Sequence, residues 1–147
     1  MAANTSNIWA GQTISATPDG RKRGKPLSDA ASPTYGRDTR GATVTLNSVS
    51  KPDYTKAACG TVVNQKFSPS MFEGERRDKL RALVRTYFRR GGPEIQMNAT
   101  SRAVLADAME HPKQYPTLVV RVSGFSDYFV RLPRAVQLDI LNRTQHE

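Results

Sequence analysis

The sequence predicts an α/β fold, and three observations lead to this prediction. Residues 75–90 carry apolar side chains at helical spacing. Residues 94–98 and 118–122 alternate or run apolar, as short strands do. Helical and strand segments also alternate toward the C-terminus, an order typical of parallel α/β architecture. With 147 residues, the chain is long enough for one domain with a modest core.

Residues 1–41 are expected to form an irregular, loop-rich lead-in. The stretch 17–20, Thr-Pro-Asp-Gly, is a turn signal because proline presets φ and glycine accepts a left-handed conformation. The basic run at 21–25 fits a nucleic-acid or localisation patch, or else a solvated or partner-facing loop. Its turn-rich flanks favour the loop. A structureless segment this long is uncommon in a compact domain, so it is either functional or held by something outside the chain.

Residues 42–147 are expected to contain the strands and helices. Alternation predicts strands over 42–46 and 60–67. Cys59 precedes the second of these. As the single cysteine it excludes an internal disulfide and fits a reducing cytoplasm, and its simplest role is that of a small buried hydrophobe.

The segment 75–90 is the clearest helix. Its apolar stripe follows the i, i+3, i+4, i+7, i+8 pattern. Seven basic residues occupy the other faces: Arg76, Arg77, Lys79, Arg81, Arg85, Arg89 and Arg90. A groove-binding helix, a solvated helix and a helix facing an acidic subunit would all show this pattern.

A third strand is predicted at 94–98, followed by a helix that Thr100 caps and that runs to about Glu110. A fourth strand at 118–122 leads into a loop around Gly124, and a final helix runs from Pro133 to about Thr144. The parallel arrangement would place functional loops at strand ends.

The composition narrows the function classes. A net charge of +9 fits nucleic acid or a large acidic partner. We expect no signal peptide and no membrane helix, because no apolar run approaches the ~18 residues that a span needs. The sequence shows no phosphate-cradling glycine loop, metal-ligand cluster or serine–histidine–acid set. We therefore expect no bound cofactor and no metal.

Gly124 allows two interpretations. A glycine at the tip of a turn can adopt a positive φ and permit a close approach. Alternatively, its Cα carries the chemistry. A glycine that loses an α-hydrogen leaves a planar carbon radical shared between the adjoining amide nitrogen and carbonyl, and no side chain twists it or blocks a partner.

The residues around Gly124 favour the second interpretation through a family resemblance. The segment 121–129, with the apolar run 118–120 before it and 137–144 after it, resembles the C-terminal glycyl radical motif of the pyruvate formate-lyase superfamily. Upstream blocks resemble its dehydratase, lyase and decarboxylase branches: 17–21, 26–29, 32–33, 46–51, 64–67 and 91–92, with Gln96 and Asn98. The similarity runs from about Trp9 to Glu147.

The resemblance implies the C-terminal portion of a ten-stranded α/β barrel, with a finger loop that carries the radical. Gly124 matches the radical glycine. The rest of the radical loop is Arg121, Val122, Ser123, Phe125, Ser126 and Tyr128. A separate activating enzyme with S-adenosylmethionine and an iron–sulfur cluster would remove one α-hydrogen, and the product would be oxygen-sensitive. A cysteine on a larger partner would become the thiyl radical that attacks the substrate.

The sequence also departs from the family. The catalytic cysteine lies in a region absent from these residues, and Cys59 is at the wrong place to replace it. Asp127 stands where a small apolar residue is usual, and Met97 where phenylalanine is common.

The sequence thus leads to a glycine radical domain over 1–147 that is not catalytic alone. One hypothesis is the small subunit of a cytoplasmic split radical enzyme. A second is a spare part that replaces an oxygen-cleaved C-terminus. A gene remnant would look identical. The alternative of another class is a basic nucleic-acid-binding or interaction module.

Overall fold

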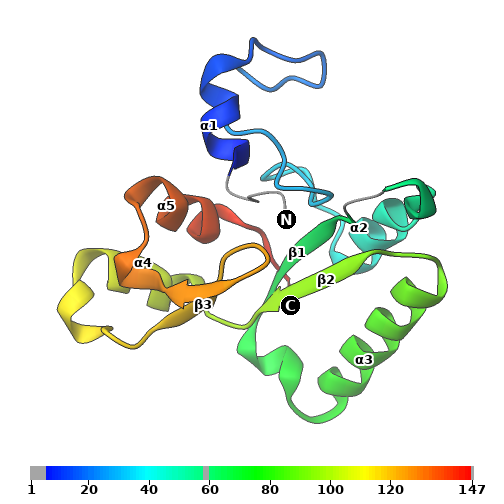
Figure 1. Cartoon of the computed structure of the whole chain (residues 1–147). Helices are drawn as coiled ribbons and strands as arrows, with labels where there is room; N and C mark the ends of the chain where they lie inside the picture. The colour runs from blue at the N-terminus through cyan, green and yellow to red at the C-terminus, as the bar shows by residue number, and fades with distance from the viewer. Residues whose placement is uncertain (1–5, 58–59, 147) are drawn as a thin grey trace.

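A three-stranded parallel sheet forms the centre of the computed structural model, which describes residues 6–57 and 60–146 (Figure 1). Its strand order is β2 (Glu94–Asn98), β1 (Val62–Phe67) and β5 (Gln145–His146). The register places Asn64 opposite Gln96. The predicted strands at 60–67 and 94–98 are confirmed, as is the parallel pairing. The last predicted helix ends at Asn142 rather than at about Thr144, and the strand β5, which the sequence did not indicate, follows it.

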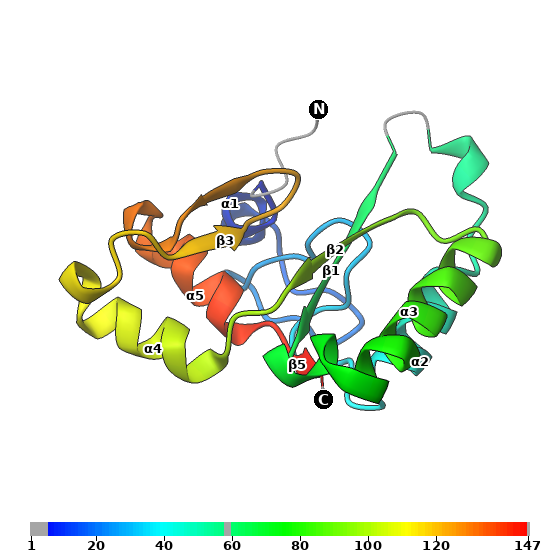
Figure 2. The same ribbon diagram turned by 90° about the horizontal axis from the view of Figure 1, so that it is seen from below.

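Two helices, α2 (Ala42–Val49) and α3 (Gly74–Arg89), lie on one side of β1 and β2 (Figure 2). Leu46, Val63 and Tyr87 are the buried centre of the contact. The predicted strand at 42–46 is wrong. Its alternation covers too few residues to exclude a helix, and the helical form brings Leu46 and Val49 onto one face against Tyr87.

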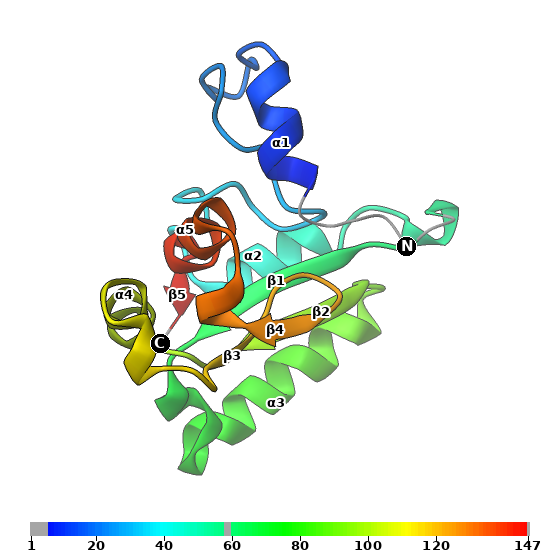
Figure 3. The same ribbon diagram turned by 60° about the vertical axis from the view of Figure 1, so that its left-hand side comes forward.

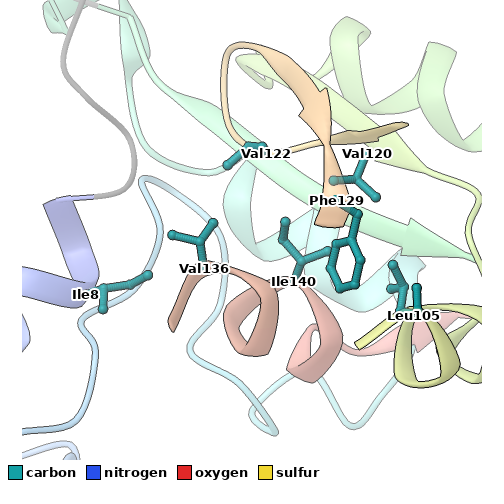
Figure 4. Close-up of a cluster of buried hydrophobic side chains, with 8 residues drawn as sticks. Ile8, Leu105, Val120, Val122, Phe129, Val136 and Ile140 are labelled. Carbon is teal, nitrogen blue, oxygen red and sulfur yellow. The ribbon is translucent and has the colours of Figure 1, made fainter. Parts of the chain in front are cut away.

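The other side of the sheet carries α4 (Arg102–Glu110), α5 (Arg134–Asn142) and a hairpin of β3 (Val119–Arg121) and β4 (Ser126–Tyr128). The predicted fourth strand therefore exists but pairs antiparallel in a separate two-stranded sheet. Figure 4 shows how the hairpin packs on the helices. The cluster consists of Ile8, Leu105, Ala108, Val120, Val122, Phe129, Val136 and Ile140.

The predicted cap of the fourth helix is displaced by one residue. The Ser101 side chain, not that of Thr100, accepts a hydrogen bond from the Val104 amide at 3.2 Å. Short 3-10 turns complete the regular structure at Tyr54–Lys56, Pro69–Phe72, Pro112–Gln114 and Phe129–Arg131.

The lead-in begins with helix α1 (Ser6–Thr13), which the sequence did not indicate and which stands apart from the sheet (Figure 3). The predicted turn at 17–20 is confirmed by a 3.0 Å hydrogen bond from the Gly20 amide to the Thr17 carbonyl. Arg21 is buried rather than solvated, and it donates to carbonyls that include Lys25 at 2.6 Å. A Cβ on Gly11 would lie 2.3 Å from the same Lys25 oxygen, so helix and loop pack backbone to backbone here.

Candidate functional site

Gly124 occupies the turn of the β3–β4 hairpin. Its φ of 79° lies in the left-handed region, where a residue with a Cβ is strained. The Val122 amide donates to the Phe125 carbonyl at 2.9 Å and closes the turn. The positive φ that a glycine at the tip of this turn can adopt is confirmed.

Two amide side chains of β2 hold the hairpin in place. The Oε1 atom of Gln96 accepts from the Gly124 amide at 3.0 Å and from Arg121 Nε at 3.2 Å. Asn98 pairs with the Arg121 backbone as a strand would. It donates to the carbonyl at 2.8 Å and accepts from the amide at 2.9 Å. The backbone that leads into Gly124 Cα, from Arg121 to the Gly124 amide, is therefore attached to one strand of the main sheet.

A buried carboxylate lies beneath the turn. Asp29 accepts hydrogen bonds from Asn64 Nδ2 at 2.6 Å and from Ser123 Oγ at 3.3 Å. The Asn64 side chain also donates to Ser123 Oγ at 3.2 Å, and the Asn64 backbone amide donates to Ser32 Oγ at 2.9 Å. These contacts join the lead-in, β1 and the radical loop, which are far apart in the sequence.

Arg143 is the cation of this network. Its Nη2 atom donates to Asp29 at 3.3 Å, to Asp139 at 3.2 Å and to the Val122 carbonyl at 2.8 Å. The Tyr35 hydroxyl donates to Asp139 from the lead-in. Asp29, Asp139 and Arg143 are buried, and Tyr35 is half-buried. Hydrogen bonds between groups shielded from water are strong, and a buried charge without its partner is costly.

Burial governs the protonation of this network. It raises the pKa of Asp29 above its usual value, and Arg143 opposes the shift. It also raises the pKa of Tyr35, with Asp139 adding to the effect, so the phenol stays protonated and acts as a donor. The native state therefore binds the Asp29 proton more tightly than the unfolded chain does.

The turn opens onto a broad cleft with a volume of about 950 Å³. Gly124 lines it together with residues from α1 and from the segments 27–30, 50–55, 60–62 and 90–94. Gly124 itself is half-buried, while Phe125 is 46% exposed. The hairpin thus combines an anchored backbone with an accessible tip.

The other predicted loop residues divide between anchoring and exposure. Val122 and Ser123 are buried, Ser126 is exposed and Tyr128 is half-buried. The Arg131 guanidinium lies 4.6 Å from the centre of the Tyr128 ring. Asp127 lies opposite the buried Val120 in the hairpin register and is half-buried. Its carboxylate accepts from the Tyr128 amide at 2.7 Å.

Sequence reasoning did not place the supporting network in the site. Asp29, Asn64, Gln96 and Asn98 were recognised only as matching blocks, and Tyr35, Asp139 and Arg143 received no role. One signal was available. Asp139 and Arg143 are oppositely charged at i, i+4 and flank Ile140 on the apolar side of α5, where ions need partners.

Lys66 is a further buried charge beside this network. Its side chain is 1% exposed, and its Nζ donates to the Leu141 carbonyl at 3.2 Å. Burial, then Arg102 and Arg143, lower its pKa to about 8. Residues 6–57 and 60–146 contain no group of three or more histidine, cysteine, aspartate or glutamate side chains that could hold a metal ion. No helix in this part of the chain is long and apolar enough to cross a membrane. Cys59 lies outside the described residues.

Comparison with known proteins relates this arrangement to a family. The family model described as "Glycine radical" matches residues 27–130. Trans-4-hydroxy-L-proline dehydratase of Clostridioides difficile is 41% identical over 146 residues. Those residues are 99% of this chain and 18% of that protein.

Solved structures agree. The glycerol-bound B12-independent glycerol dehydratase of Clostridium butyricum superposes with a TM-score of 0.92 at 43% identity, covering 95% of this chain and 18% of that one. The hydroxyproline dehydratase of C. difficile with trans-4-hydroxy-L-proline bound gives 0.89 at 41%, covering 97% and 18%. The chain thus spans about a fifth of the length of these relatives. It carries a glycine radical domain and belongs to the glycyl radical enzyme family.

Proposed function

We propose that Gly124 is the residue that stores the radical. The observation that carries the proposal is the hairpin itself. A glycine with φ of 79° stands at its turn, Gln96 holds the glycine amide, and the residue lines a wide cleft. The segment 121–129 also resembles the family's radical motif, with Gly124 at the position of the radical glycine.

The proposed chemistry starts with removal of one hydrogen atom. Homolysis of one Cα–H bond of Gly124 leaves a neutral radical, and the abstracting group gains the hydrogen. The family's activating enzymes supply that abstraction with S-adenosylmethionine and an iron–sulfur cluster, so this chain would bind neither. Its own part is to position the Cα through the Gln96 and Asn98 contacts, and to leave it free of a side chain.

We further propose that the stored radical passes to a cysteine of a larger partner. The cysteine S–H bond would break, its hydrogen would move to Gly124 Cα, and a thiyl radical would remain on sulfur. Two features support a partner on this side. The cleft borders Gly124, and the described sheet has three strands with β2 and β5 at its edges, as a section of a barrel would.

The partner would supply most of the active site. The relatives with bound ligands are named as dehydratases, and we place the reaction with radical dehydratases, lyases and decarboxylases. This chain alone should accept the radical from an activating enzyme but should turn over no substrate.

Electron paramagnetic resonance tests the radical assignment. After anaerobic incubation with a family activating enzyme, the wild-type chain should give a glycine-centred doublet, and Gly124→Ala should give none. Gly24→Ala is the matched control, because Gly24 has a similar φ of 80° with open space around it. It introduces the same backbone strain at an exposed residue that does not line the cleft. A doublet that survives in Gly124→Ala would refute the assignment.

Reconstitution distinguishes the two roles left open by the sequence. A split subunit should confer activity on a barrel protein that has the thiyl cysteine but no radical glycine of its own. A spare part should instead restore a full-length enzyme already cut by oxygen. If activated chain restores neither, radical transfer to a partner is wrong, even where the doublet is present.

A further inference from the structure

Four arginines form a row along the outer side of α3. Arg77, Arg81, Arg85 and Arg89 follow each other at intervals of four residues, and all are exposed. The apolar stripe of the helix, with Leu80 and Tyr87 buried, faces the sheet. Because residues four apart share one helix face, the arginine row lies on the side away from the sheet.

The arginines of this row repel each other. Successive members are about 6 Å apart along the helix axis. That is inside the screening length of roughly 8 Å at physiological salt. Among the described residues, no ion pair or hydrogen bond is recorded for these four side chains. Like charges at i, i+4 weaken a helix, and the chain has a net charge of +9, so the row is a feature that folding alone disfavours.

An exposed aromatic side chain borders the row. Phe88 is 50% exposed and follows Arg85 by three residues, which places it beside the arginine row. Arginine and aromatic residues are enriched at protein interfaces, and truncation of such residues often costs the most binding energy. A nucleic-acid backbone would offer Phe88 charged phosphates, whereas a protein surface can cover it with apolar side chains.

We propose that the arginine row and Phe88 form a docking surface for an acidic protein. The partner would present carboxylates at helical i, i+4 spacing, so that they meet successive arginines, with an apolar side chain against Phe88. The radical loop lies on the opposite side of the sheet (Figure 2). This surface does not depend on the proposed radical chemistry.

A synthetic helical peptide serves as the probe. It carries glutamates at four-residue intervals with one leucine beside them, and its binding to the full chain is followed by fluorescence anisotropy. Arg81→Glu combined with Arg85→Glu should weaken binding by about tenfold or more, because attraction becomes repulsion along the row. The control, Lys22→Glu with Arg23→Glu, makes the same change of net charge on exposed lead-in residues and should cost less than about threefold.

Further measurements keep the proposal falsifiable. Circular dichroism should show the row variant folded and at least as stable as wild type. Three repulsive i, i+4 pairs are replaced by two attractive ones, with Arg77 and Arg89, and one repulsive pair between the two glutamates. Amide exchange should show protection by the peptide in residues 77–89. Equal losses in both double variants, absence of binding to the wild type, or tighter binding of random-sequence duplex DNA at physiological salt would each overturn the proposal.

Discussion

The two faces of the β1–β2 pair are built from different kinds of contact. Toward α2 and α3 the pair presents Val63 and Ile95, which pack with Leu46 and Tyr87. Toward the hairpin it presents Asn64, Gln96 and Asn98, whose side chains bond the loop and its support. Because successive side chains of a strand point to opposite faces of the sheet, one pair of strands can present apolar side chains to the helices and amide side chains to the hairpin.

This difference shows how positioning and stability are separated. Apolar packing is non-directional and tolerates small shifts, so the helix face mainly stabilises the fold. Hydrogen bonds depend on distance and angle, so the hairpin face fixes individual backbone atoms of Arg121 and Gly124. The cost is a set of buried charges that must remain paired.

Removing the cation of the buried network should have the largest effect on stability. Arg143→Met leaves Asp29 and Asp139 as buried carboxylates without their cation, so we expect a loss of about 3–5 kcal/mol. Urea unfolding measures it. Arg134→Met is the control, because its pair with Glu110 is exposed, and it should cost at most about 1 kcal/mol. Equal costs would mean that the hairpin face is not held by charge.

Lys66 should give a gain in stability where Arg143 gives a loss. Its pKa falls from 10.5 to about 8, so at neutral pH the native state holds a buried ammonium at a cost of up to about 3 kcal/mol. Lys66→Met should therefore stabilise the protein. The Leu141 carbonyl keeps a donor, since Arg102 Nη1 bonds it at 2.8 Å.

The pH dependence of unfolding tests the same residue. Between pH 8 and 10.5 the unfolded chain holds the Lys66 proton while the native state releases it, so Lys66 should contribute a rise in the free energy of unfolding with pH across this window. Lys66→Met should lose that part of the slope. Lys79→Met, on the exposed side of α3, should keep it. An unchanged slope in Lys66→Met would show that Lys66 is not the titrating group.

Gln96 should separate positioning from stability most clearly. Gln96→Leu deprives the Gly124 amide and Arg121 Nε of their acceptor but keeps the side-chain volume, so the global cost should be about 1–2 kcal/mol. Exchange of the Gly124 amide should nevertheless quicken by about tenfold. Met97→Leu, one residue away on the other face, should leave that exchange unchanged. Comparable acceleration in both variants would contradict the role of Gln96.

The sequence predicted the sheet, its longest helix and the radical loop, but it did not predict the polar contacts on the hairpin face. The periodicity of 75–90 and the short strands at 60–67 and 94–98 predicted the sheet and its longest helix because burial there follows a repeat. The motif at 121–129 indicated the radical loop. By contrast, Asp29 and Arg143 meet across 114 residues of chain. No local pattern encodes a contact of that kind.

The errors have a similar origin. Residues 42–46 alternate like a strand but form a helix because the tertiary contact with Tyr87 decides between the two. The strand at 118–122 was expected in the main sheet. Its short turn around Gly124 returns the chain into β4 instead, and the pairing becomes a hairpin.

The position at which oxygen cuts the chain tests the central claim most directly. A carbon radical at Gly124 should react with oxygen, and mass spectrometry of the activated chain after exposure to air should show a break at that residue. The released C-terminal piece should contain about 23 residues, and neither the unactivated chain nor Gly124→Ala should release it. Activated chain that stays intact in air, or that breaks elsewhere, would contradict the assignment of the radical to Gly124.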